Sequence, residues 1–226
     1  MSAPKKHAEF AASNSERWVN CPASLKLSKK APPQKSGAAA DEGTLAHALM
    51  EEVLQTDVKN IVKFYERDKQ YPLEMKKHVQ GFVDWVRKER KPHHELLVEE
   101  KVQLDFIHPT DAFGTVDVAI IEPFGVLHIV DFKYGQGFVN HKDNSQMIFY
   151  ALGIAHKYEY DFEEVRTTIY QPRAGSTDVA RTDSFSVEKL KAWRDTFRQA
   201  VRACENADVE KDVNAGEWCK FCPAKI

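Results

Sequence analysis

The stretch "GTVDVAIIEPFGVLHIVDFKYGQG", residues 114–137, contains two apolar segments that each carry an acidic residue. Their alternating pattern predicts two strands, residues 113–121 and 126–135, joined by a turn at residues 123–125. Asp131 and Lys133 then share one face of a strand, and Asp117 meets Asp131 if the two strands are neighbours. Two adjacent carboxylates repel each other, so this arrangement calls for a compensating cation.

The rest of the chain predicts helices around a sheet. Helical patterns cover residues 13–29, with an interruption at Pro22, and residues 41–55, 73–90, 144–158 and 186–207, and further strands are expected at 95–104 and 164–172. The expected fold class is α/β, with a central mixed sheet that contains an antiparallel meander and is flanked by helices. We expect one domain over residues 1–226, a mobile loop at 30–43 and an irregular, cysteine-bearing tail at 207–226.

Composition sets limits on partners and location. The 226 residues are 42 % hydrophobic and 29 % charged, which excludes a disordered chain, and the net charge of −2 means that a nucleic acid would need a local basic patch. No apolar run approaches the roughly 18–20 residues of a membrane span. The expected location is the cytoplasm.

Two carboxylates and a lysine on neighbouring strands suit a metal site. Mg²⁺ prefers oxygen ligands and is commonly held by one or two carboxylates together with a substrate phosphate. Lys133 would act there either as a point charge on the phosphate or as a lysine with a lowered pKa that orients or deprotonates water. The ordinary alternative is a surface ion pair between Asp131 and Lys133, with Asp117 simply solvated.

The order of motifs over residues 43–150 resembles the PD-(D/E)XK nucleases, and within them the RecB-like exonuclease branch. "GTLAHALMEEVL" resembles the branch's first motif with His47, "GTVD" and "VDFKYG" resemble the strands that carry Asp117, Asp131 and Lys133, and "QMIFY" resembles the Gln-x-x-x-Tyr motif with Gln146 and Tyr150. Val116 stands where the superfamily's name has proline.

The resemblance implies a restriction-endonuclease-like core and a DNA exonuclease that hydrolyses phosphodiester bonds with Mg²⁺ or Mn²⁺. Such enzymes serve recombination, repair or the processing of DNA ends, in a cell or for a phage. His47, Asp117 and Asp131 would be the metal ligands, and Gln146 and Tyr150 would bond phosphate oxygens or brace the lysine. Glu51 and Glu100 are lesser candidates for supporting roles.

Four cysteines in a chain expected in the cytosol favour a metal or a catalytic role over disulfides. Cys21, Cys219 and Cys222 resemble three of the four ligands of the [4Fe-4S] cluster that some members of the RecB-like branch carry, whose last cysteine lies beyond the Cys-x-x-Cys pair. Cys204 is either a substitute ligand or, as we prefer, a buried thiol. Zinc and no metal at all are the alternatives.

Lys191, Arg194, Arg198 and Arg202 recur at helical spacing and form a basic stripe that suits a nucleic-acid backbone or, more simply, a solvated helix face. Two other functions compete with the nuclease. One is a nuclease-like module that binds nucleic acid without turnover, and the other is a zinc-binding regulatory protein built on Cys219 and Cys222, which leaves the strand carboxylates unexplained.

Overall fold

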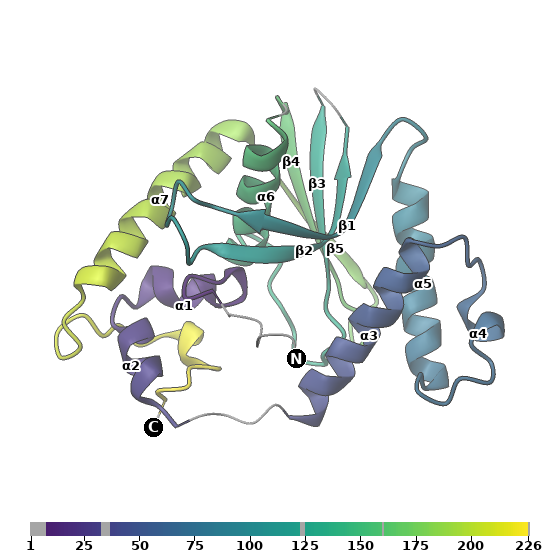
Figure 1. Ribbon diagram of the computed structural model, residues 1–226, viewed down its shortest axis with the longest axis horizontal. Coiled ribbons are helices and arrows are strands. Elements are labelled where there is room, and N and C mark those ends of the chain that lie inside the picture. The colour runs from purple at the N-terminus through teal and green to yellow at the C-terminus, as the bar shows by residue number, and fades with distance from the viewer. Residues whose placement is uncertain (1–7, 33–36, 123–124, 160, 226) are drawn as a thin grey trace.

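The computed structural model describes residues 8–32, 37–122, 125–159 and 161–225, which form a mixed five-stranded sheet between two groups of helices (Figure 1). In chain order the helices are the 3₁₀ turn η1 (Ala12–Asn14), α1 (Ser15–Asn20), α2 (Ser24–Lys30), α3 (Ala38–Leu54), α4 (Ile61–Phe64), α5 (Leu73–Glu89), α6 (Ser145–Tyr158), α7 (Val187–Asn206) and the 3₁₀ turn η2 (Glu217–Cys219). The strands are β1 (Glu95–Gln103), β2 (Phe113–Ile121), β3 (Val126–Phe132), β4 (Glu164–Tyr170) and β5 (Ala180–Ser186).

The strands lie in chain order across the sheet, β1-β2-β3-β4-β5. The pairs β1–β2 and β2–β3 are antiparallel, which confirms the predicted meander. β4 runs parallel to β3 because α6 connects them as a crossover, and β5 returns antiparallel to β4. The prediction of a mixed sheet flanked by helices is therefore confirmed.

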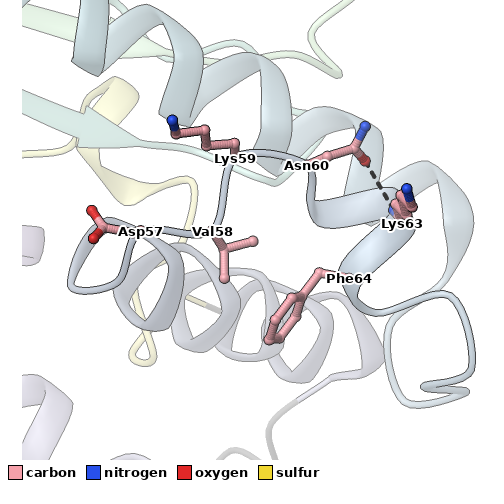
Figure 2. Close-up of a pocket in the computed structure, with 6 residues that line it drawn as sticks. All are labelled: Asp57, Val58, Lys59, Asn60, Lys63 and Phe64. Atoms are coloured by element: carbon pink, nitrogen blue, oxygen red, sulfur yellow. Dashed lines mark hydrogen bonds between the residues drawn. The ribbon is translucent and has the colours of Figure 1, made fainter.

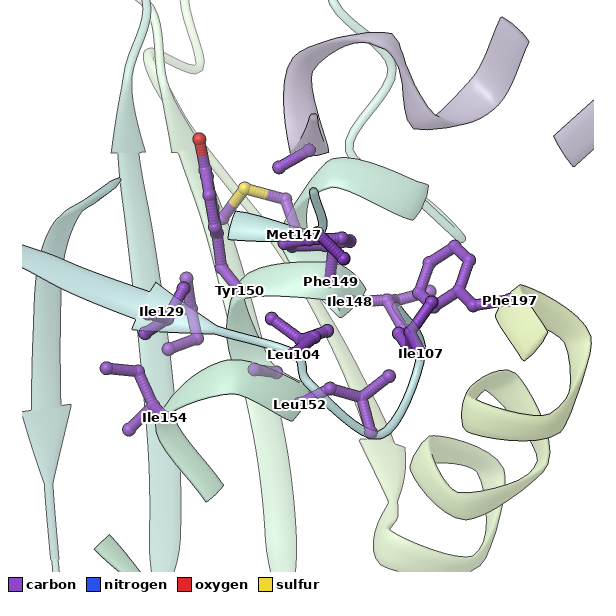
Figure 3. Close-up of a cluster of buried hydrophobic side chains, with 14 of the residues drawn as sticks. Leu104, Ile107, Ile129, Met147, Ile148, Phe149, Tyr150, Leu152, Ile154 and Phe197 are labelled. Carbon is purple, nitrogen blue, oxygen red and sulfur yellow. The ribbon is translucent and has the colours of Figure 1, made fainter. Parts of the chain in front are cut away.

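Helices cover both faces of the sheet, so the core has two parts. One cluster joins the sheet to α1, α6 and α7, which we call the α6 layer, and Figure 3 shows Leu104, Ile129, Phe149 and Phe197 gathered around α6. The other cluster joins the opposite face to α3, α4 and α5, the α3 layer. Strands buried on both faces read as apolar runs, which explains why β2 and β3 are so hydrophobic.

The side chains of β1 and β2 exchange the faces of the sheet to which they point at the middle of the hairpin. Glu99 has a φ of 51°, in the left-handed region that non-glycine residues seldom adopt. In β1, Val98 packs in the α3 layer but Val102 packs in the α6 layer, and in β2 Val118 and Val116 divide in the same way. The even-numbered side chains thus cross from one face to the other at Glu99, and β1 and β2 swing away from β3 (Figure 1).

The caps of two helices agree with the sequence. The Asn144 side chain accepts a hydrogen bond from the backbone N–H of Met147 at 3.2 Å, so α6 begins as predicted. Ser186 caps α7 in the same way through the N–H of Lys189 at 3.3 Å.

Three expectations need correction. The predicted mobile loop at 30–43 is wrong for residue 30, the last of α2, and for residues 38–43, because α3 begins at Ala38, and residues 33–36 lie outside the described part of the chain. Ala38–Ala40 are good helix formers that extend the helix three residues before the predicted start at Asp41. The short helix α4 and the strand β5 were not predicted.

Among the residues that the structure describes, no helix has the length and apolar character needed to cross a membrane.

Candidate functional site

Asp117 lies where β2 separates from β3. The antiparallel pairing of these strands ends at Val118 and Val130. Beyond this point Asp117 Oδ2 accepts the backbone N–H of Phe132 at 2.8 Å, so the carboxylate satisfies a donor that a continuing ladder would have paired. The opening of the sheet therefore places a carboxylate between two strands, and its side chain is held there.

Asp131, Lys133, Gln146 and Tyr150 form a connected polar chain. Lys133 Nζ lies 3.1 Å from Asp131 Oδ2 and donates to Gln146 Oε1 at 3.2 Å. Gln146 Nε2 lies 2.9 Å from Asp131 Oδ1 and 3.3 Å from the Tyr150 hydroxyl oxygen. Asp131 and Lys133 lie on one side as predicted, although β3 ends at Phe132 and not at residue 135, so that Lys133 follows the strand. The N-terminal turn of α6 braces both side chains.

Tyr150 reaches this group from the hydrophobic cluster of α6. Its ring is buried among apolar side chains while its hydroxyl end points away from the cluster (Figure 3). The ring also packs against Gly114, where a Cβ would lie 3.0 Å from Tyr150 Cε1. The glycine of the "GTVD" motif thus leaves space for the tyrosine of the "QMIFY" motif.

His47 approaches from the opposite layer. It projects from α3, and its Nδ1 lies 3.4 Å from Asp117 Oδ1 and 3.8 Å from Glu99 Oε1. Its ring packs against Phe132, with ring centroids 5.7 Å apart. The α3 and α6 layers therefore both contribute to one site, and the structure brings together His47, Asp117, Asp131, Lys133, Gln146 and Tyr150, the six residues that the motifs suggested.

Glu99 is the member of the site that the sequence did not reveal. The ligand atoms of His47, Glu99 and Asp117 lie within 4.8 Å of one another. The neighbouring candidate Glu100 is engaged elsewhere, because its carboxylate contacts Lys157 and accepts from the Tyr158 hydroxyl at 3.0 Å. Glu51 accepts a hydrogen bond from Gln55.

Burial and neighbouring charges shift the pKa values of the ionisable side chains in the site. Burial opposes ionisation of Asp117, but the nearby His47 outweighs it and the pKa of Asp117 is lowered. Burial and the charge of Asp117 raise the pKa of Asp131, against the attraction of Lys133. Burial lowers the pKa of His47, but Asp117 and Glu99 raise it to about 11. The carboxylates of the site are therefore held beside two protonated partners, His47 and Lys133.

Lys133 and Tyr150 stay protonated. Although burial lowers the pKa of Lys133, the charges of Asp131 and Asp117 raise it above its ordinary value. Burial and the same carboxylates raise the pKa of the Tyr150 phenol. Lys133 therefore carries a positive charge beside the two carboxylates.

The donor set suits a hard divalent cation. Asp131 is only 2 % exposed, and its Oδ2 is buried without a hydrogen bond from any residue in the described ranges, although Lys133 Nζ is near. Lys133 is thus the cation that faces this buried oxygen, and burying a carboxylate requires such a partner. With Glu99, Asp117 and the His47 imidazole close by, the site offers the oxygen-rich ligands with one nitrogen that Mn²⁺ accepts readily and Mg²⁺ tolerates.

The cysteines divide into a buried thiol and a tail that docks on the N-terminal helices. Cys204 is buried and lies 3.2 Å from the Trp18 carbonyl oxygen, and burial, with a smaller effect of Cys21, raises the pKa of its thiol to about 12, as the preferred interpretation as a buried thiol expects. Asn214 donates its backbone N–H to Cys21 Sγ at 3.4 Å, and Arg17 bonds the Phe221 carbonyl at 3.2 Å. The Cys219–Cys222 segment therefore lies against α1, near the helix end that carries Cys21. Within the described ranges, the groups of donors within 4.8 Å contain no cysteine.

The basic stripe on α7 is partly occupied by contacts within the protein. Arg198 donates through Nε to the Phe106 carbonyl at 2.8 Å, and both Arg194 and Arg198 lie 3.6 Å from Asp195. Lys191 and Arg202 are exposed. The stripe thus has the ion pairs of an ordinary helix surface, and its role with nucleic acid stays a prediction.

Two other features lie apart from this site. A pocket of about 630 Å³ beside α4 is lined by Asp57–Asn60, Lys63 and Phe64, and none of these belongs to the carboxylate site (Figure 2). A second group of possible metal ligands, His93, His94 and Glu122, lies where β1 begins and β2 ends.

The fold and the site together define a mixed α/β protein with a carboxylate, histidine and lysine site at an opening in its sheet. The chain belongs to a protein family of unknown function, DUF2800, whose model matches residues 7–226. The match covers nearly the whole chain, so the site lies within the family's own domain.

Proposed function

We propose that this protein is a Mg²⁺- or Mn²⁺-dependent deoxyribonuclease with a restriction-endonuclease-like core, acting as an exonuclease in recombination, repair or the processing of DNA ends. The observation that carries the proposal is the convergence of His47, Glu99 and Asp117 with Asp131 and Lys133 at one opening in the sheet. A mixed sheet in which α6 links an antiparallel meander to a parallel strand supports the fold assignment.

The protein side chains have separable roles in this proposal. His47, Glu99, Asp117 and Asp131 would hold the cation, which when bound stabilises charge on the phosphate and lowers the pKa of an attacking water. Lys133 supplies a fixed positive charge beside the phosphate that is cut. Gln146 positions Lys133 and Asp131 through its two hydrogen bonds. Tyr150 orients the Gln146 amide through its hydroxyl.

The proposal is tested by incubating end-labelled single-stranded and double-stranded DNA with Mg²⁺ or Mn²⁺. We expect degradation by the wild-type protein and a loss of at least about 100-fold in Asp131→Asn and Lys133→Ala, since each removes a charge that contacts the reacting phosphate or its metal. Release of mononucleotides from an end would establish the exonuclease action. Degradation that survives both substitutions refutes the site, and DNA binding without degradation under any condition favours a nuclease-like binding module instead.

Glu99 and Glu100 provide a matched pair for the metal site, because they are adjacent acids of the same strand with different partners. Mn²⁺ binding is measured by isothermal titration calorimetry in a His94→Ala background, which removes one of the three members of the second group of possible ligands. We expect Glu99→Gln to weaken Mn²⁺ binding by at least about tenfold, while Glu100→Gln leaves it unchanged. Equal effects of the two substitutions would remove Glu99 from the ligand set.

We also propose a [4Fe-4S] cluster bound in part by Cys21, Cys219 and Cys222. Its support is the docking of the tail against α1, which joins regions almost 200 residues apart through Cys21 with Asn214 and Arg17 with Phe221. Such a cluster would fasten the two ends of the domain together. Anaerobically purified protein should be brown, with visible absorption that is lost in Cys21→Ala, and iron-free, colourless wild-type protein contradicts the cluster.

A further inference from the structure

The loop of residues 133–144 begins and ends in the candidate site. Lys133 stands at its start, and Gln146, just after its end, bonds that lysine at 3.2 Å. Its tip carries Phe138, whose side chain is 60 % exposed although large apolar side chains are normally buried. An exposed aromatic ring on a loop that is anchored at both ends in a catalytic site is placed to meet the substrate.

The buried side-chain amide of Gln171 holds the tip of this loop in a fixed shape. Gln171 is 1 % exposed and donates through Nε2 to the carbonyls of Gly135 at 2.9 Å and Gly137 at 2.7 Å. Its Oε1 accepts the backbone N–H of Val139 at 3.3 Å. Gln171 therefore grips the backbone on both sides of Phe138. A ring fixed in this way loses little conformational entropy when a ligand stacks on it.

The guanidinium group of Arg181 lies against one face of the Phe138 ring. Its guanidinium carbon lies 4.3 Å from the centroid of Phe138, and its Nη2 donates to Gln171 Oε1 at 2.8 Å. Arg181 pairs with Ile169, which pairs with Asp131, so the three residues form one row across β5, β4 and β3. Neighbouring strands are ~4.8 Å apart, so the backbones of Arg181 and Asp131 are about 10 Å apart. Residues in one row point their side chains to the same face of the sheet.

The Arg181 guanidinium is buried and has no anionic partner among the residues that the structure describes. Its side chain is 6 % exposed, and its Nε and Nη1 have no hydrogen-bond partner among the described residues. No carboxylate in the described ranges forms an ion pair with it within 4.0 Å. Burying a cation without an anion is costly. The positive field of Arg181 attracts an anion that passes over the loop, because no carboxylate of the described residues lies beside it to offset that field.

We propose that Phe138, backed by Arg181, is a stacking platform for a base of single-stranded DNA. One face of the ring is occupied by the guanidinium, and a base stacks against the exposed side of the ring. The charge of Arg181 attracts the phosphates of the same strand. Stacking needs a base with a free face, which a single strand offers and the interior of a duplex does not. This inference rests on the proposed function for its substrate class and adds the preference for single strands.

Binding of a fluorescently labelled oligothymidine and of a blunt duplex of equal length is measured by anisotropy, with EDTA present so that the strands stay intact. We expect Phe138→Ala to raise the Kd for the single strand about 5- to 150-fold, the range that base stacking on an aromatic side chain covers. Phe138→Trp should restore binding, and the duplex affinity should change less than about twofold in both variants.

Phe64→Ala is the matched control. Phe64 is 66 % exposed and stands beside Lys63 in the pocket of Figure 2, so it combines an exposed ring with positive charge but belongs to the α3 layer. It should leave the Kd for the single strand unchanged. Arg181→Gln should lower the slope of log Kd against log salt by roughly 0.7, and Arg181→Lys should keep the slope. Near-ultraviolet circular dichroism establishes that both Arg181 variants remain folded.

The outcomes separate this inference from the proposed function. If Phe138→Ala binds single strands as well as the wild type, or if Phe64→Ala loses as much affinity, the platform is refuted even where Asp131-dependent cleavage is observed. If the wild type binds no single strand, the platform is refuted as well. Single-strand binding that depends on Phe138 without any cleavage refutes the nuclease and retains the platform.

Discussion

His128 lies in the middle of β3 as a buried, uncharged base, and its burial has a consequence for acid stability. Its Nε2 lies 2.8 Å from the Thr168 hydroxyl, and burial together with the nearby Arg166 lowers the pKa of His128 from 6.5 to about 3. Between these two pH values the unfolded chain binds a proton that the folded chain does not. Stability is therefore complete above about pH 6.5 and falls as the pH drops. At pH 5 this loss amounts to about 2 kcal/mol.

The assay compares the wild type with His128→Gln, whose amide retains a hydrogen-bonding group for Thr168 without the titrating imidazole. Urea unfolding is followed by tryptophan fluorescence at pH 7, 6, 5 and 4.5, so that the contributions of all other titrating groups cancel in the difference. We expect the variant to be less stable at pH 7 and to gain about 2 kcal/mol on the wild type by pH 5. A difference that stays constant from pH 7 to pH 4.5 would refute the reasoning.

Glycines in two helices and one strand give further predictions. Gly153→Ala in α6 should lower the free energy of unfolding by about 1–2 kcal/mol, because the new Cβ would lie 2.6 Å from Val102 Cβ, whereas Gly43→Ala in α3, with nothing within 4 Å, should raise it by up to about 1 kcal/mol. Urea titrations at pH 7 check both, and a stabilised Gly153→Ala would contradict the close packing. Gly114→Ala should push the Tyr150 ring aside and, under the proposed function, lower DNA cleavage severalfold while the protein stays folded. Unchanged turnover in Gly114→Ala would show that Tyr150 does not need its present position.

The parts of the fold that follow from local patterns could be predicted from the sequence. β2 has the predicted bounds, because an apolar run between turn residues has few other stable conformations. α6 and α7 begin beside the predicted caps, since an Asn or Ser side chain satisfies a free backbone N–H wherever the helix starts. The six predicted site residues also come together, because each is fixed by the register of a strand or a helix.

Elements whose stability depends on distant partners could not be predicted. β5, with the sequence "ARTDSFS", has only Arg181 and Phe185 buried, and its strand conformation comes from pairing with β4. A polar edge strand of this kind has no apolar alternation to reveal it. Gln171 is similar: its sequence context is that of a strand end, and only the folded loop shows that its amide holds the backbone around Phe138.

The kink at Glu99 explains both why the site exists and why one of its members was missed. In a regular strand Glu100 lies on the same face as Val98, and Glu99 lies on the opposite face. The alternating pattern of the sequence therefore predicts a face for each of the two acids without taking the bend into account. The left-handed φ of Glu99 reverses this assignment for everything that follows in β1. It also turns β1 and β2 away from β3, and the resulting gap receives the carboxylate of Asp117. A backbone conformation that costs a non-glycine residue about 1 kcal/mol or more thus produces the opening in which His47 and the carboxylates meet. Backbone strain of this kind clusters at functional sites, so the left-handed φ of Glu99 adds an independent reason to propose the site around Glu99 and Asp117.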